Sequence, residues 1–267
     1  MVVPRRRSAL LSSVAAWVVP YRLWEARRRW QQLRSGGCSA HRSIGIALSG
    51  RRTNALATTR LDLLPGKVLD AVGIVVDVGA NVGAWTAGVL DVAHPRQVFV
   101  FEPSPQVFPI VRQRFVGRSD VNVIQAAVGD RDGSTSFYVT LHSHNASVLP
   151  PRENARALLA NGADVRQRVD VDMIRLDTAL AGVAAGDILK IDVQGFERSV
   201  LAGASATLRK TSWVLLEANF VSLYDGDLLL PELHALIVSS GFSLANLSQP
   251  YVRKGRALFS DALYQRN

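Results

Sequence analysis

The chain has 267 residues, of which 48% are hydrophobic and 20% are charged. These values lie close to globular averages and exclude a mostly disordered or fibrous protein. A single cysteine, Cys38, excludes a disulfide framework and any cysteine-rich metal site. No apolar run reaches the ~18 residues that a membrane-spanning helix needs. One domain with an extension fits this length better than two full domains.

The net charge of +9 is concentrated at the amino terminus. Residues 1–60 hold twelve arginines and one acid, Glu25, which gives +11. Residues 61–267 hold 19 basic and 21 acidic residues, which gives −2. We therefore expect a basic amino-terminal arm over 1–60, helical or partly disordered, followed by a mildly acidic domain over 61–267.

The arm is compatible with several roles. Three arginines at 5–7 and a mostly apolar stretch over 8–19 are typical of a signal peptide, but no small-residue cleavage pattern follows. We therefore expect a cytoplasmic protein. Residues 21–34 mix tyrosine, tryptophan and leucine with five arginines, which suits contact of residues 1–34 with an anionic membrane surface. A poorly ordered tail, a helix packed on the domain and attachment to nucleic acid are the alternatives.

Strand-like and helix-like segments alternate from residue 68 onward. Short β-branched and apolar runs predict strands at 74–78, 97–101, 121–128, 188–193, 213–218, 242–247 and 257–263. Helical periodicity predicts helices at 84–93, 105–115, 200–209 and 228–239. This alternation predicts an α/β fold, with a Rossmann-like, mostly parallel sheet covered by helices on both faces.

Residues 134–174 break this alternation. Added strands are predicted at 134–141 and 168–174, around a loop with two histidines and a short helix near 152–160. An insertion at this point in the chain lies beside the carboxyl ends of the strands, where such sheets bind ligands.

The turn after the first strand predicts a nucleoside site. Asp77 is followed by Gly79 and Gly83, which allow a tight turn and a close approach of the next helix. Glu102 ends the second strand 19 residues after Gly83, where an acid can accept hydrogen bonds from both hydroxyls of a ribose. The patterns that bind pyrophosphate and nucleoside triphosphates are absent, and the aspartate favours a sulfonium over a phosphate. S-adenosylmethionine is therefore the expected cofactor.

Five motifs then occur along the domain: V-D-V-G-A-N-V-G (76–83), F-E-P-S-P (101–105), A-A-V-G-D (126–130), I-R-L-D-T-A-L (174–180) and L-K-I-D-V-Q-G-F-E (189–197). Over roughly residues 70–265 the chain closely resembles the FkbM family of S-adenosylmethionine-dependent methyltransferases. The resemblance implies a class I methyltransferase fold, with a seven-stranded sheet whose last strand is antiparallel. It also implies O-methylation of hydroxyls on sugars, glycolipids or polyketides.

The resemblance assigns the cofactor contacts by position. It assigns the methionine end to Asp77, Gly79, Asn81 and Gly83, the ribose to Glu102, and the adenine to Ala127 and Val128.

Asp192 is the residue on which we expect the chemistry to depend. It ends the fourth predicted strand, and Lys190 lies on the same strand face, from which it can pair with Asp192. Transfer of a methyl group to an alcohol requires alignment of the reactants and gains from a positioned base. Glu197 and Asp177 lie at helix starts, where an acid is equally well explained as a cap, and Glu217 ends the fifth strand at the same cleft edge.

His142 and His144 in the insertion offer a second base or a pair of metal ligands. Magnesium bound by Asp192 and Glu217 is a further alternative, although no spacing demands it. The sequence leaves the metal open.

Three functions fit these observations. The first is an O-methyltransferase acting on a hydroxyl of a sugar, glycolipid or polyketide-type natural product. The second is an RNA-modifying methyltransferase that uses the basic arm, and the third is a non-catalytic nucleoside-binding or membrane-adaptor protein. The domain is net negative and its insertion lacks a basic and aromatic RNA-binding pattern, and the acids at 77, 102 and 192 favour an active enzyme.

Overall fold

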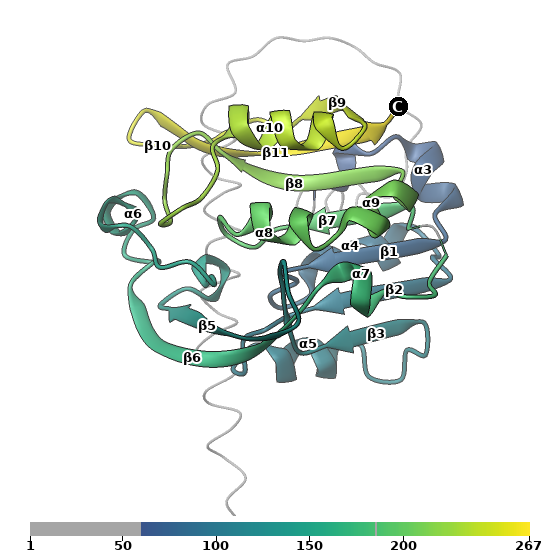
Figure 1. Ribbon diagram of the computed structural model, residues 1–267, viewed down its shortest axis with the longest axis horizontal. Coiled ribbons are helices and arrows are strands. Elements are labelled where there is room, and N and C mark those ends of the chain that lie inside the picture. The colour runs from purple at the N-terminus through teal and green to yellow at the C-terminus, as the bar shows by residue number, and fades with distance from the viewer. Residues whose placement is uncertain (1–59, 185) are drawn as a thin grey trace, which may run out of the picture. The chain divides into compact units, whose positions relative to one another are not determined.

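A mostly parallel sheet forms the centre of the domain in the computed structural model, which describes residues 60–184 and 186–267. Its strands are β1 (Ile74–Val78), β2 (Gln97–Phe101), β3 (Val121–Ile124), β7 (Ile188–Ile191), β8 (Trp213–Asn219), β9 (Phe242–Leu247), β10 (Tyr251–Arg253) and β11 (Arg256–Arg266). They lie in the order β10-β11-β8-β7-β1-β2-β3, and β9 also pairs with β11 (Figure 1). Strands β3, β2, β1, β7 and β8 run parallel, and β11 is antiparallel to β8. This arrangement confirms the predicted α/β sheet with an antiparallel last strand, and β10 adds an eighth strand to the seven that were predicted.

The central strands form because their residues are apolar, mostly β-branched and shielded on both faces. Every residue of β1 and of β7 is buried, as expected for strands in the middle of a parallel sheet. The two polar exceptions, Asp77 and Lys190, are direct neighbours in the register of β1 and β7. The sheet therefore carries an opposite-charge pair in its interior, one residue before the end of β1 and of β7.

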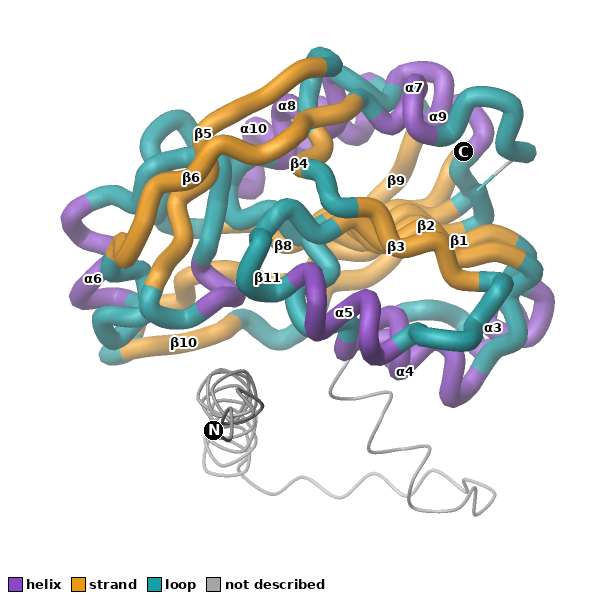
Figure 2. Tube along the Cα trace, turned by 90° about the horizontal axis from the view of Figure 1, so that it is seen from below, coloured by secondary structure: helices purple, strands orange, loops and turns teal. Residues whose placement is uncertain are grey.

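Helices cover both faces of the sheet. Figure 2 shows α3 (Gly66–Ala71), α4 (Ala84–Val92) and α5 (Phe108–Arg114) on one face, and α7 (Leu176–Ala179), α8 (Glu197–Ala202), α9 (Ser205–Lys210) and α10 (Leu230–Ser239) on the other. Under the second group lies a buried apolar cluster that includes Val76 and Val214 of the sheet and Leu201, Leu208 and Leu233 of the helices. Burial of these side chains stabilises the fold and fixes the strand ends that carry the polar residues.

The predicted insertion forms a second sheet of three strands. Strands β4 (Ala127–Val128), β5 (Gly133–Thr140) and β6 (Val165–Ile174) pair in the order β4-β6-β5, and η2 (Ser143–Asn145) and α6 (Glu153–Leu158) lie between β5 and β6 in the chain. The strands predicted at 134–141 and 168–174 are therefore confirmed, as is the short helix near 152–160.

Two predicted elements are interrupted in the structure. The strand expected over 121–128 ends at Ile124, because Ala127 and Val128 satisfy their backbone groups by pairing with β6 in the second sheet. The helix expected over 200–209 is divided into α8 and α9 around Gly203. A Cβ atom at Gly203 would lie 1.9 Å from the carbonyl oxygen of Gly129, so only glycine fits at this point of close contact between the two segments. The helix is interrupted at the same point. The three-residue strand β10 was not predicted.

The basic arm predicted over 1–60 lies outside the described residues, except for Arg60. Its helical character, its boundary and its contact with a membrane therefore stay predictions. Arg60 donates to Asp261 on β11 over 2.9 Å, and Leu61 is fully buried directly after it, in the short helix η1 (Leu61–Leu63). Across residues 60–184 and 186–267, no helix has the length and apolar character needed to cross a bilayer.

Candidate functional site

A pocket opens at the carboxyl ends of β1, β2 and β7 and encloses about 570 Å³, part of it open to solvent. The strand order reverses between β1 and β7, which is where open parallel sheets bind ligands. The polar lining includes Asn81, Glu102, Ser143, His144, Asp192 and Gln194. The apolar lining includes Phe101, Ala127, Val128, Phe137 and Phe196. The pocket therefore suits a ligand with one polar and one apolar part.

The turn after β1 brings the backbone close to the end of β7. Gly79, Asn81 and Gly83 all have positive φ angles, of 76°, 49° and 71°. A Cβ atom at Gly79 would lie 1.9 Å from the carbonyl oxygen of Asp192, so only glycine allows the two segments to pass. Gly79 and Asn81 line the pocket, whereas Gly83 precedes α4 and packs near Phe115.

Glu102 lines the pocket with a carboxylate that the backbone holds on both sides. Its Oε2 accepts from the N–H of Asn81 and its Oε1 from the N–H of Ser104, each over 2.8 Å. Burial raises the pKa of this carboxyl to about 7, although the two N–H groups act in the opposite direction. Each oxygen keeps a further acceptor position, so the group can take additional hydrogen bonds from a ligand.

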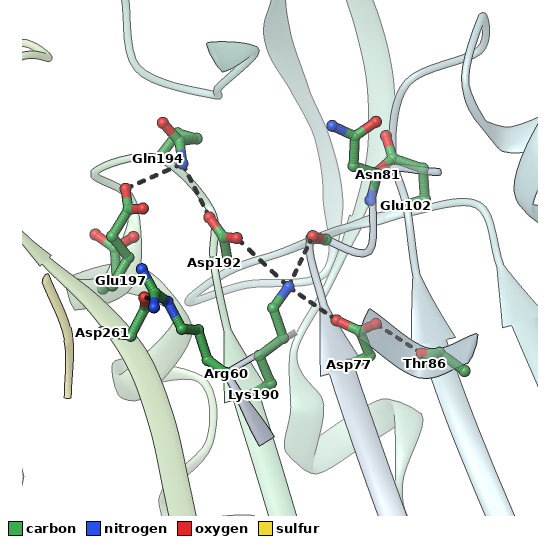
Figure 3. A network of polar contacts seen from close by, with 12 residues as sticks. Arg60, Asp77, Asn81, Thr86, Glu102, Lys190, Asp192, Gln194, Glu197 and Asp261 are labelled. Atoms are coloured by element: carbon green, nitrogen blue, oxygen red, sulfur yellow. Dashed lines mark hydrogen bonds and ion pairs between the residues drawn. The ribbon is translucent and has the colours of Figure 1, made fainter. Parts of the chain in front are cut away.

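Asp77 lies behind the pocket and is not among its lining residues. Its side chain is fully buried, with Lys190 Nζ 3.0 Å from one oxygen and Thr86 Oγ1 donating to the other over 2.6 Å (Figure 3). Lys190 Nζ also donates to the carbonyl of Gly79 over 3.2 Å and lies 3.5 Å from Asp192 Oδ2. Burial lowers the pKa of Lys190, but the carboxylates of Asp77 and Asp192 more than offset this effect and raise it. Lys190 is therefore a fixed ammonium group between two acids.

Asp192 follows β7 directly and lines the pocket, with 36% of its side chain exposed. Gln194 Nε2 donates to Asp192 Oδ1 over 2.9 Å and to Glu217 Oε1 over 3.2 Å. The amide nitrogen thus lies between Asp192 and Glu217, the two acids that the sequence suggested as magnesium ligands. Within the described part of the chain, no cluster of three or more His, Cys, Asp or Glu side chains is arranged to hold a metal ion.

The insertion places His144 on the pocket wall. The rings of His142 and His144 are 5.4 Å apart, and burial lowers the pKa of His142, which keeps that ring neutral at neutral pH. Ser143, between them, donates to Asn81 Oδ1 over 3.0 Å. The insertion is therefore tied directly to the turn after β1.

Two other acids weighed in the sequence serve the local backbone. Glu197 begins α8 and accepts from the N–H of Gly195 over 3.1 Å, and burial raises its pKa to about 7. Asp177 caps α9 by accepting from the N–H groups of Ala206 and Thr207 over 2.8 and 2.7 Å. Burial alone would raise the pKa of Asp177, but these bonds together hold it below its usual value.

Sequence reasoning missed Gln194 and Tyr224. Gln194 lies inside a motif in which only the charged residues suggested a function, and Gly195 after it was the available signal for an unusual backbone. Tyr224 donates from its hydroxyl to Gln194 Oε1 over 2.9 Å, although 30 positions separate them in the chain. No local pattern marks such a contact.

Comparison with known proteins gives a consistent family. A family profile described as "Methyltransferase FkbM domain" matches residues 77–244. The chain is 31% identical over 246 residues to the 31-O-demethyl-FK506 methyltransferase FkbM of Streptomyces tacrolimicus, covering 82% of this chain and 90% of that protein. It is 28% identical over 177 residues to the 2-O-methyltransferase NoeI of Sinorhizobium fredii, covering 62% and 71%.

A solved structure is also similar. The crystal structure of methyltransferase FkbM from Methylobacillus flagellatus aligns with a TM-score of 0.47 and 16% identity, over 72% of this chain. The alignment covers 43% of the crystallised chain, so the present chain spans less than half of that protein.

Proposed function

The chain belongs to the FkbM family of S-adenosylmethionine-dependent methyltransferases, and we propose that it methylates a hydroxyl group of a small-molecule acceptor. The names of two relatives support oxygen as the methylated atom: one is a 2-O-methyltransferase and the other acts on 31-O-demethyl-FK506. The proposed acceptor class is a sugar, glycolipid or polyketide-type natural product. The observation that carries the proposal is a partly exposed carboxylate, Asp192, in the same pocket as the doubly anchored Glu102.

The residues of the pocket fit S-adenosylmethionine. When bound, this cofactor supplies an electrophilic methyl group on a positively charged sulfur. We assign Glu102 to the ribose hydroxyls, because its oxygens are pre-oriented and retain acceptor capacity. Ala127 and Val128 belong to the apolar lining that suits adenine, and Gly79 and Asn81 form the turn assigned to the methionine end.

The charges behind the pocket support a cationic ligand. Asp77 and Asp192 flank a single ammonium group, Lys190, so the three residues together carry negative charge. Excess negative charge near the pocket favours a sulfonium over a neutral or anionic group. In this proposal Asp77 acts indirectly, by holding Lys190 and through it the turn at Gly79.

Asp192 is proposed to orient the acceptor hydroxyl and to accept its proton. A neutral alcohol is a weak nucleophile, and a positioned base typically contributes 10²–10⁴-fold to the rate. Lys190 cannot serve as this base because its neighbours keep it protonated, so we assign it a positioning role. His144, also on the pocket wall, is the second candidate base.

The function is tested by incubating the full chain with methyl-labelled S-adenosylmethionine and separate lipid, carbohydrate, polyketide and RNA fractions. We expect label in a small-molecule or glycolipid fraction, as an ether that resists mild alkali. Label that enters only RNA would contradict the proposed acceptor class.

The role of Asp192 is tested by Asp192→Asn, which keeps the shape of the side chain and removes its basicity. We expect the variant to stay folded, to bind the cationic cofactor more weakly because one negative charge is lost, and to lose about 10²-fold or more in turnover at saturating cofactor. His144→Gln is measured in parallel. Near-normal turnover of a folded Asp192→Asn enzyme would remove Asp192 from the mechanism, and loss of turnover in His144→Gln alone would transfer the role to His144.

A further inference from the structure

We infer that Gln194 and Tyr224 are positioning residues that hold the carboxylate of Asp192 in one orientation toward the acceptor. This inference rests on the role proposed for Asp192. Neither Gln194 nor Tyr224 is assigned a function by the family match or by the sequence motifs.

One orientation of the Gln194 amide is strongly favoured. Both hydrogens of Nε2 are directed to carboxylates, one to Asp192 Oδ1 at 2.9 Å and one to Glu217 Oε1 at 3.2 Å. Its Oε1 accepts from the hydroxyl of Tyr224 at 2.9 Å. Rotation of the amide by 180° would place its oxygen against two carboxylates and lose both of those bonds, while only the contact with the Tyr224 hydroxyl could be kept, with its direction reversed.

Asp192 is therefore held from two sides. Gln194 binds Oδ1 and the ammonium of Lys190 lies 3.5 Å from Oδ2, yet 36% of the side chain stays exposed. A carboxylate with one contact could rotate about its side-chain torsions. With a contact at each oxygen, it presents a fixed face to the pocket, which is what alignment of an acceptor hydroxyl requires.

The backbone at Gln194 is shaped for this contact. Gln194 has a φ of 56° and the following Gly195 a φ of 96°, both in the left-handed region. Ser147 of the insertion donates to the carbonyl of Gln194 over 2.8 Å and so holds this conformation. A Cβ atom at Gly195 would lie 3.1 Å from Tyr224 Cβ and 2.9 Å from Asp227 Cβ, so the glycine lets Tyr224 approach.

Tyr224 is equally constrained. It is fully buried, and Asp227 Oδ2 accepts from the N–H groups of Leu223 and Tyr224 over 2.8 and 3.2 Å. Its hydroxyl shares one proton between Gln194 Oε1 and the carbonyl of Asn145, 3.0 Å away in the insertion. Burial raises the pKa of Tyr224 well above its usual value, with nearby carboxylates adding to the effect, so the group stays a neutral donor.

A continuous chain of contacts thus runs from the insertion to Asp192 through Tyr224 and Gln194. Tyr224→Phe removes one hydroxyl from this chain without changing the shape of the ring. We expect the variant to stay folded with a moderately lowered melting temperature, because two buried acceptors lose their donor, to keep its cofactor affinity, and to lose about tenfold in kcat with KM changed by less than twofold. Tyr138→Phe is the matched control, because Tyr138 lies on β5, outside the lining of the pocket and near Arg168. It should leave turnover unchanged.

A double variant separates positioning from a general structural effect. If Tyr224 acts through Asp192, Tyr224→Phe should lower turnover in the native enzyme and add nothing in an Asp192→Asn background. An equal loss of turnover in both backgrounds would overturn the inference. Full turnover of Tyr224→Phe, where Asp192→Asn is inactive, would also overturn it.

The contact can be measured without any turnover. Hydrogen exchange at the side-chain amide of Gln194, followed by nuclear magnetic resonance, should be slow in the native enzyme and at least tenfold faster in Tyr224→Phe. Equal exchange rates in the two proteins would show that Tyr224 does not hold the amide of Gln194, whatever the measured activities are. Faster exchange in Tyr224→Phe would confirm the contact between Tyr224 and Gln194. If Asp192→Asn nevertheless had normal turnover, the role proposed for Asp192 would be wrong, and with it the positioning role of the other two residues.

Discussion

Glu102 faces the pocket while the backbone holds both of its oxygens. The N–H groups of Asn81 and Ser104 fix the carboxylate, and burial raises its pKa to about 7. A ligand that donates two hydroxyl groups stabilises the ionised form, because charged acceptors make stronger hydrogen bonds. Binding of a ribose and ionisation of Glu102 are therefore coupled.

This coupling predicts that S-adenosylmethionine binds more tightly as the pH rises from 6 to 8. Below its pKa of about 7 the carboxyl must lose a proton before it can act as a charged acceptor, so affinity falls on the acidic side. Calorimetric titration at pH 6, 7 and 8 measures the effect. Glu102→Gln should bind about 1–3 kcal/mol more weakly at pH 8 and lose most of the pH dependence.

Glu197→Gln is the matched control for this titration. The carboxyl of Glu197 has a pKa raised to about 7, as that of Glu102 has, but Glu197 does not line the pocket. The Glu197→Gln variant should therefore keep the pH dependence of cofactor binding. A native enzyme whose affinity is the same at all three pH values would contradict the assignment of Glu102 to the ribose.

For single residues, the sequence predicts those that lie at the end of a strand or in the turn after it. It misses contacts between residues that are far apart in the chain. The acid at Glu102 and the glycine at Gly79 could be located because turns between strands and helices have recognisable chemistry. The shortest contact of Lys190 could not be predicted. Its spacing from Asp192 is visible in the chain, but its closer partner, Asp77, depends on the register between β1 and β7.

Among the elements, α9 depends on a carboxylate from another helix. Asp177, in α7, accepts the N–H groups of Ala206 and Thr207 in the first turn of α9, and also the hydroxyl of Thr207 over 2.8 Å. The N–H groups at the start of a helix have no partner within the helix, so Asp177 supplies the missing acceptor. A residue of a family motif thus joins two helices.

We predict that Asp177→Ala lowers the free energy of unfolding by about 1 kcal/mol, within the usual range for loss of a cap, and leaves turnover per folded molecule unchanged. Urea unfolding and an activity assay on the same preparation measure both quantities. The exposed Asp172 on β6 provides a comparison, because Asp172→Ala should change stability by less than about 0.5 kcal/mol. A large loss of turnover in stable Asp177→Ala would assign the residue to the reaction.

Elements were predictable where local pattern and burial agree. The segments 74–78 and 97–101 are strands over the predicted residues, because their apolar side chains are buried in the centre of the sheet. The segment 121–128 has the same pattern but is divided, since its last residues pair with Met173 and Ile174 of β6. The break at Gly203 depends on the carbonyl of Gly129, which lies far away in the chain. Neither partner can be inferred from a local window.

For the whole molecule, two buried carboxyls make the main contribution to the change of stability between pH 5 and pH 8, and His142, whose pKa burial lowers, acts in the opposite direction. Glu102 and Glu197 both have a pKa raised from 4.5 to about 7 in the folded protein. Between these values the folded chain binds more protons than the unfolded chain, so the free energy of unfolding decreases as the pH rises. Each carboxyl contributes at most about 1.4 kcal/mol per pH unit in this interval.

We therefore predict that the protein without ligand is less stable at pH 8 than at pH 5, by a few kcal/mol. The double variant Glu102→Gln/Glu197→Gln should lose most of this difference, because neither amide titrates. Urea unfolding at pH 5, 6, 7 and 8 provides the comparison. A double variant that retains the full pH dependence would assign it to other groups.

The two ends of the insertion meet at a single place on the molecule. Ala127 and Val128 enter it in parallel with Met173 and Ile174, and the N–H of Gly129 donates to the carbonyl of Ile174 over 3.1 Å. A segment whose ends are adjacent can be lengthened, shortened or replaced with little strain on the rest of the chain. Residues 130–173 contribute Phe137, Ser143, His144, Ala146 and Val148 to the pocket wall, and their two ends join the rest of the chain at this one place. A segment grafted here from a relative would therefore renew part of the pocket wall, and it would have to keep the contacts of Asn145 with Tyr224 and of Ser147 with Gln194 for Asp192 to stay in place.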